Sequence, residues 1–121
     1  NAVNGVNYYL VVKHRNSIET WSKPGGEVFV SDSLSYDFTS SSSQAFGSNM
    51  KLVEGKWCFY SGDINQDGTI DASDLSDADN DATTGESGYV NTDVTGDDYV
   101  DATDISIIDN NSFNSVSMIT P

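Results

Sequence analysis

Two stretches in the second half of the chain decide its fold: DINQDGTIDASDL at residues 63–75 and DVTGDDYVDATDI at residues 93–105. They begin thirty residues apart, and oxygen-bearing side chains fall at positions 1, 3, 5, 9 and 12 of each. Position 8 is apolar in both. This pattern is typical of an EF-hand-type loop, which wraps six to eight oxygen ligands around Ca²⁺ and adds the backbone carbonyl of position 7. We therefore predict two Ca²⁺ sites.

The first loop fits this pattern at every position. Gly68 stands at position 6, where the loop turns sharply. The predicted ligands are the side chains of Asp63, Asn65, Asp67, Asp71 and Asp74 and the carbonyl of Thr69.

The second loop departs from the pattern in two places. Thr95 replaces a carboxamide at position 3 and is a poorer donor, and Asp98 stands where glycine is preferred. Asp tolerates a left-handed backbone better than most residues, so Asp98 strains the loop but does not rule out a Ca²⁺ site. The predicted ligands are the side chains of Asp93, Thr95, Asp97, Asp101 and Asp104 and the carbonyl of Tyr99. We expect this second site to bind Ca²⁺ more weakly than the first.

The charge distribution supports the metal prediction. An acidic run is usually only a solvated surface, but here two loops match in the same register. Residues 1–60 carry five basic and five acidic side chains, whereas residues 61–121 carry fourteen acidic side chains and no basic one. Without a counter-ion these carboxylates repel one another, so we expect the second half to fold only with metal bound. Nucleic acid is a poor partner for such a surface.

The first half of the chain predicts β-strands. Apolar and polar residues alternate at 6–12, 34–38 and 56–60, and shorter apolar runs lie at 18–21 and 28–30. These segments favour an antiparallel sandwich of about five strands, whereas an immunoglobulin-like sandwich has about seven. We expect the missing strands either upstream of this segment or supplied by a neighbouring subunit through strand addition. The predicted regions are residues 1–60, mainly β, and residues 61–121, two calcium loops with short helices at 75–81 and 105–111.

Four local expectations complete this picture. Ile70 and Val100, at position 8 of the loops, should pair through a short backbone bridge. A small core should join them to Leu75, Ile105, Ile108 and Phe113. Asp79 and Asp109 occupy equivalent positions of the two repeats and should cap the helix ends rather than reach the other repeat's ion. Cys58, the single cysteine, should be a buried small hydrophobe.

The second half resembles the dockerin family, whose duplicated loops share the pattern D-x-N-x-D-G-x-I-D-x-x-D. Asp74 and Asp104 reproduce its aspartate at position 12. The whole chain is similar to C-terminal modules of large surface proteins from bacteria that use type nine secretion. The matching segments are YYLVVKHRNSIETWS at 8–22, YDFTSSSSQAFGSNM at 36–50, GDINQDG at 62–68 and GYVNTD at 88–93. The resemblance implies a non-enzymatic, calcium-stabilised extracellular module that follows an immunoglobulin-like β region.

The sequence contains no recognisable pattern of catalytic residues. His14 is the only histidine and falls near a strand end, where packing or turn capping is the better explanation. A glycosidase needs two carboxylates across a groove, and nothing in the sequence predicts such a groove. We expect a protein that is not an enzyme.

Three functions remain open. We favour a secreted subunit of a bacterial surface filament that binds copies of itself by strand addition, with the apolar tail at Val116, Met118 and Ile119 as an exchanged or docking strand. The alternative is a dockerin-like attachment module for a cohesin-like partner, although the expected helices lack the basic, leucine-rich faces with which dockerins bind cohesins. The third is a carbohydrate-binding domain, suggested by five aromatic side chains of residues 1–60: Tyr8, Tyr9, Trp21, Trp57 and Tyr60. An extracellular or cell-surface location is expected, with the targeting segment removed. No apolar run is long enough for membrane insertion.

Overall fold

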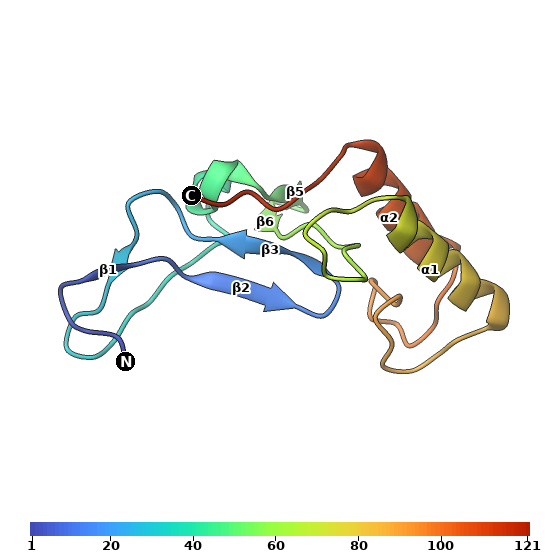
Figure 1. The fold of residues 1–121 in the computed structure, drawn as a ribbon, viewed down its shortest axis with the longest axis horizontal. Helices are drawn as coiled ribbons and strands as arrows, with labels where there is room; N and C mark the ends of the chain where they lie inside the picture. The colour runs from blue at the N-terminus through green and yellow to red at the C-terminus, as the bar shows by residue number, and fades with distance from the viewer. The chain divides into compact units, whose positions relative to one another are not determined.

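The computed structural model describes all residues 1–121 and consists of short strands, two 3₁₀ helices and two α-helices (Figure 1). The strands are β1 (Asn7–Tyr8), β2 (Val11–His14), β3 (Ser17–Trp21), β4 (Glu27–Val28), β5 (Lys51–Val53) and β6 (Lys56–Cys58). The helices are η1 (Ser42–Gln44), η2 (Phe46–Ser48), α1 (Ala72–Thr84) and α2 (Ala102–Phe113). The strands form three two-stranded sheets, β1–β4, β2–β3 and β5–β6. The fold is thus a set of small antiparallel sheets with two helices, and no closed sandwich is present.

The chain divides into two compact units. The strand unit comprises Asn1–Val12, Thr20–Phe59 and Ile119–Pro121, and the loop unit comprises Lys13–Glu19 and Tyr60–Met118. This division differs from a boundary at residue 60 in two short segments. The tip of the β2–β3 hairpin groups with the loop unit, and the last three residues group with the strand unit.

Aromatic ring contacts dominate the packing of the strand unit. Tyr9 lies against both Trp21 and Phe46, with ring centroids 5.8 and 6.1 Å apart. Phe38 lies between Tyr36 and Phe59 at 4.7 and 5.2 Å. The only fully buried apolar residues of this unit are Ala45 and Met50.

In this unit one expected strand is absent, one observed strand was not expected, and one burial prediction was wrong. Residues 34–38 form no strand, because the Asp37 carboxylate accepts hydrogen bonds from the Thr39 amide at 2.8 Å and hydroxyl at 2.7 Å and so turns the chain. Strand β5 was missed, because it is short and pairs only with β6 across the turn at Glu54 and Gly55. Cys58 is exposed on β6, so its predicted burial was also wrong.

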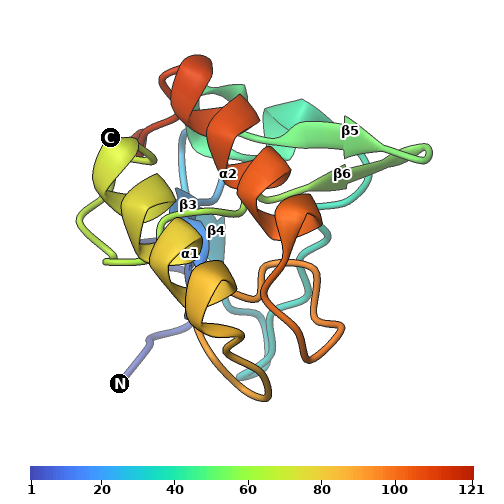
Figure 2. The same cartoon turned by 90° about the vertical axis from the view of Figure 1, so that its right-hand side faces the viewer.

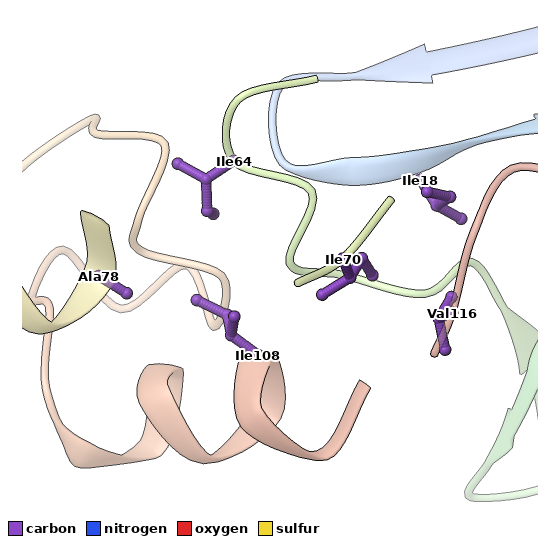
Figure 3. Packing of buried hydrophobic residues seen from close by; sticks show 6 residues of the cluster. All are labelled: Ile18, Ile64, Ile70, Ala78, Ile108 and Val116. Atoms are coloured by element: carbon purple, nitrogen blue, oxygen red, sulfur yellow. The ribbon is translucent and has the colours of Figure 1, made fainter. Parts of the chain in front are cut away.

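The loop unit contains the main apolar core (Figure 3). Six buried residues form the cluster: Ile18, Ile64, Ile70, Ala78, Ile108 and Val116. Leu75 and Ile105 pack against it, as predicted, whereas Phe113 is 87% exposed and takes no part. The core therefore includes residues from both helices and from the first predicted calcium loop.

Both α-helices begin inside the loops. Asp71 and Asp101, at loop position 9, are the N-cap residues, and Asp74 and Asp104 complete a capping box at the third helical position. A capping box satisfies amide groups that the first helical turn leaves without partners. The helices consequently start three residues earlier than predicted and run side by side (Figures 1 and 2).

Each of the two predicted calcium loops pairs with the segment that follows the other repeat's helix. The Ile70 amide donates to Val116 at 2.9 Å, and the Met118 amide donates to Gly68 at 2.8 Å. The second loop repeats this arrangement, since the Val100 amide donates to Glu86 at 3.2 Å and the Gly88 amide donates to Asp98 at 2.8 Å.

This reciprocal pairing replaces the predicted bridge between Ile70 and Val100, which was wrong. The backbone amides of Ile70 and Val100 already donate to Val116 and Glu86, so they are not available to pair with each other. The same pairing fixes Val116 and Met118 against the first loop of their own chain.

No helix of the chain is both long and apolar enough to cross a membrane.

Candidate metal sites

Four predicted ligands are among the most deeply buried side chains of the molecule. Asp63 and Asp93, at loop position 1, are each 2% exposed, and Asp74 and Asp104, at position 12, are each 0% exposed. Burying an ionised carboxylate is costly unless an opposite charge or a set of hydrogen bonds compensates. These four residues therefore mark the interior of each site.

The two carboxylates at position 12 hold the loops closed in the same way. Asp74 Oδ1 accepts from the amides of Ile64 and Asn65 at 2.7 and 3.2 Å, and Asp74 Oδ2 accepts from the Asp71 amide at 2.9 Å. Asp104 repeats this, with amide bonds from Val94, Thr95 and Asp101 at 3.0, 3.0 and 2.9 Å. Each carboxylate thus joins the start of its loop to the start of its helix.

The two carboxylates at position 1 receive amides from the middle of the loop. Asp63 accepts from Asp67 at 3.1 Å and from Gly68 at 3.2 Å. Asp93 accepts from Gly96, Asp97 and Asp98 at 2.7, 3.3 and 2.9 Å and from the Thr95 hydroxyl at 3.2 Å.

The pKa values of these two residues shift in opposite directions. Burial raises the pKa of Asp63, and the negative charges of Asp74 and Asp67 raise it further. Burial also acts to raise the pKa of Asp93, but the hydrogen bonds from Gly96, Asp98, Thr95 and Asp97 together lower it. Two amide bonds do not offset burial and the neighbouring charges at Asp63, whereas the larger set of bonds does so at Asp93, and a cation would stabilise the ionised form of Asp63.

The remaining predicted ligands lie toward the surface. Asp67 Oδ1 accepts from the Thr69 amide at 3.0 Å, and Asp97 Oδ1 accepts from the Tyr99 amide at 3.1 Å. These bonds orient the position-5 carboxylates. The exposed members of the predicted set are Asn65, Asp67, Thr95, Asp97, Tyr99 and Asp101, and the half-buried ones are Thr69 and Asp71.

The second loop brings three carboxylates close together. Asp93, Asp97 and Asp104 each offer an oxygen atom within 4.8 Å of the others. This cluster could hold a metal ion.

The backbone of each loop is left-handed at positions 4 and 6. In the first loop these are Gln66 at φ 59° and Gly68 at φ 90°, and in the second they are Gly96 at φ 78° and Asp98 at φ 73°. Each loop thus has glycine at one of its two left-handed positions. In the second loop the glycine is Gly96 at position 4, where it adopts the left-handed backbone without a steric cost. The sequence pattern had pointed only to position 6.

The tip of the β2–β3 hairpin joins the two loops, which sequence reasoning missed. Asn16 is 3% exposed, and its Nδ2 donates to the carbonyls of Asn91 at 2.9 Å and Asp93 at 3.0 Å. Its own carbonyl accepts from the Gly62 amide at 2.7 Å, immediately before the first loop. Asn16 therefore contacts the entrance of both loops.

Two further side chains strengthen this connection. Gln66 Nε2 donates to the Ser17 carbonyl at 3.3 Å and to the Asp63 carbonyl at 2.6 Å. The Arg15 guanidinium donates to the Val90 carbonyl and lies 4.0 Å from the centre of the Tyr89 ring. Residues 13–19 are far from both loops in the sequence, so no local pattern could have assigned them to the site.

No protein-family model, no curated protein and no solved structure matches this chain.

Proposed function

We propose that both loops bind Ca²⁺ and that the ion is required for the loop unit to fold. Support comes from the four buried carboxylates, because none takes part in a salt bridge. The two salt bridges of the chain join Lys13 to Glu19 and Lys23 to Glu27. A donor set made only of carboxylate, carboxamide, hydroxyl and carbonyl oxygens suits Ca²⁺ better than a transition metal. Tyr99 and Thr69 would contribute their carbonyls, and the first site would bind more tightly than the second.

We further propose that the protein is a non-enzymatic structural subunit of an extracellular assembly, such as a bacterial surface filament. The observation that carries this proposal is the exposure of apolar residues on and beside the short strands. Val3, Val6, Val11, Val28, Val30, Leu52 and Val53 are all exposed in the strand unit. Exposed apolar residues on short strands with open edges are typical of a surface that receives another strand or chain.

The partner that fits this surface is another copy of the chain. Strands supplied by a neighbour would extend the small sheets toward an immunoglobulin-like sandwich and would cover the exposed valines. Calcium would stiffen the loop unit of every subunit. An extracellular location supplies the millimolar Ca²⁺ that weaker sites of this type require.

Electron microscopy and analytical ultracentrifugation of the purified chain test this function. We expect ordered fibres or a concentration-dependent series of oligomers in 2 mM CaCl₂, a concentration chosen to fill sites of about millimolar affinity. The same sample with EDTA should contain only small species, and Mg²⁺ in place of Ca²⁺ is the matched control. A monodisperse monomer in Ca²⁺ at high protein concentration would contradict the proposal and favour the attachment-module alternative.

A further inference from the structure

A groove lies between the two α-helices of the loop unit. It has a volume of about 380 Å³ and is lined by Leu75, Ser76, Asp79, Ile105 and Asp109. Leu75 and Ile105 are half-buried, whereas Asp79 and Asp109 are exposed. The expected capping role for these two aspartates was wrong, since the helix ends at Gly85 and Asn114 are closed by backbone hydrogen bonds. The α1–α2 groove thus combines two apolar side chains with two carboxylates that form no salt bridge.

The β5–β6 hairpin of the strand unit presents the opposite charge. Lys51 pairs with Cys58 and Val53 pairs with Lys56 across the two strands. Side chains alternate between the faces of a strand, so these four residues share one face. All four are exposed. This hairpin face therefore carries two ammonium groups and two apolar side chains without a covering element.

The five basic residues of the chain differ in how they are used. Lys13 and Lys23 form salt bridges, and Arg15 stacks on Tyr89. Lys51 and Lys56 form neither kind of contact, although they stand together on the hairpin face. Because residues 61–121 contain no basic side chain, the groove finds its complementary charge only in the first half of a chain.

We propose that the hairpin face of one copy docks into the α1–α2 groove of a second copy, so that Lys51 and Lys56 meet Asp79 and Asp109. This inference rests on the self-assembly proposed above and names one of its junctions. Val53 and Cys58 would cover Leu75 and Ile105. Hairpin and groove are different surfaces, so a contact in which each copy meets two different neighbours is heterologous and generates an open chain of subunits or a ring.

Exchanging the charges tests the junction. The first variant carries Lys51→Glu and Lys56→Glu, and the second carries Asp79→Lys and Asp109→Lys. All four positions are exposed, so both variants should keep the wild-type circular dichroism in Ca²⁺. We expect each variant alone to need at least a tenfold higher concentration for half-assembly. An equimolar mixture should assemble again, because the hairpin of each variant then complements the groove of the other.

Asp77→Lys is the matched control, since Asp77 is exposed on α1 but does not line the groove. It should assemble like the wild type. Cys58 supplies an independent readout without added labels, because it is the only cysteine and lies on the hairpin face. Its alkylation by a maleimide should slow at least tenfold in the wild-type assembly and stay fast in either charge-reversal variant.

The outcomes separate the two proposals. A wild-type chain that stays monomeric in Ca²⁺ refutes self-assembly and this junction with it. A wild-type chain that assembles while both variants assemble equally well, with Cys58 still reactive, leaves self-assembly standing but shows that the groove takes another occupant or none.

Discussion

The loop unit buries six apolar residues in one cluster, whereas the strand unit fully buries only Ala45 and Met50 and leaves most of its valines exposed. Both units are near the size at which a core alone stabilises a fold poorly. In the loop unit, aspartates at fixed spacing close the loops, cap the helices and so bring the apolar positions together. The strand unit has no such device and depends on ring contacts. The difference agrees with the proposal that ions complete one unit and a neighbouring chain completes the other.

Removal of calcium should have the largest effect and should separate the two units. With EDTA we expect most of the helical circular dichroism to disappear, because four buried carboxylates then repel one another without a counter-ion. Hydrogen exchange followed by mass spectrometry should show faster exchange throughout α1 and α2 and a smaller change at β5 and β6. Added Ca²⁺ should restore the signal. Equal loss of protection in both units would show that the strand unit depends on Ca²⁺ as much as the loop unit does.

Substitution of single ligands should rank the two loops. Asp63→Ala or Asp74→Ala should lower the free energy of unfolding in Ca²⁺ by about 3 kcal/mol or more, since each removes one partner from a buried charged site. Asp93→Ala or Asp104→Ala should cost less. Urea unfolding with calcium titration measures both series, and the Asp→Asn variants are the controls for size. Equal losses in the two loops would contradict the order of affinity.

Truncation of apolar side chains should distinguish the two units by burial. Ile108→Ala removes a fully buried side chain from the loop-unit cluster and should cost about 3 kcal/mol. Val30→Ala removes a side chain that is 67% exposed and should change the stability of the monomer by less than about 0.5 kcal/mol. Urea unfolding at low protein concentration provides the comparison. If Val30→Ala costs as much as Ile108→Ala, the strand unit has a core of its own and needs no neighbour.

Asn16→Ala should show how strongly the hairpin tip supports the loops. It leaves the buried Asp93 carbonyl and the part-buried Asn91 carbonyl without the Asn16 donor and should cost about 1–3 kcal/mol. Lys13→Ala at the same tip removes an ion pair whose lysine is exposed and is the control, with an expected cost below about 1 kcal/mol. Calcium affinity should fall with Asn16→Ala for both loops. Unchanged affinity would show that the tip is not part of the sites.

The smallest expected effect concerns the left-handed residue of the second loop. Asp98→Gly should raise the free energy of unfolding by about 0.5–1 kcal/mol, because glycine adopts φ 73° without a steric cost. The backbone bond from residue 98 to Asp93 is retained. Thermal unfolding in Ca²⁺ detects the change, with Gln66→Gly as the corresponding test at position 4 of the first loop. A lower melting temperature for Asp98→Gly would mean that its carboxylate supports the site.

The sequence predicted the loop unit better than the strand unit, and the reason is physical. The loop spacing and the capping box are local patterns, so the two loops and the existence of both helices follow from spacing alone. The early helix start was missed because Asp71 and Asp101 serve both as predicted ligands and as N-caps. The role of Asn16 had no local signal, since its partners lie 75 and 77 residues away. The Asp37 turn overrode an alternation that favoured a strand at residues 34–38.

The reciprocal pairing of the repeats sets an order for the folding of a newly made chain. The second loop pairs with residues 86–88, which precede it, but the first loop pairs with residues 116–118, near the last residue of this segment. As synthesis or export proceeds from the N-terminus, the second loop can close as soon as it emerges. The first loop, although made earlier and closed locally by Asp74, has no pairing segment until Met118 is out. We therefore expect the first of the two proposed ion sites to gain its last support only when the whole loop unit is present.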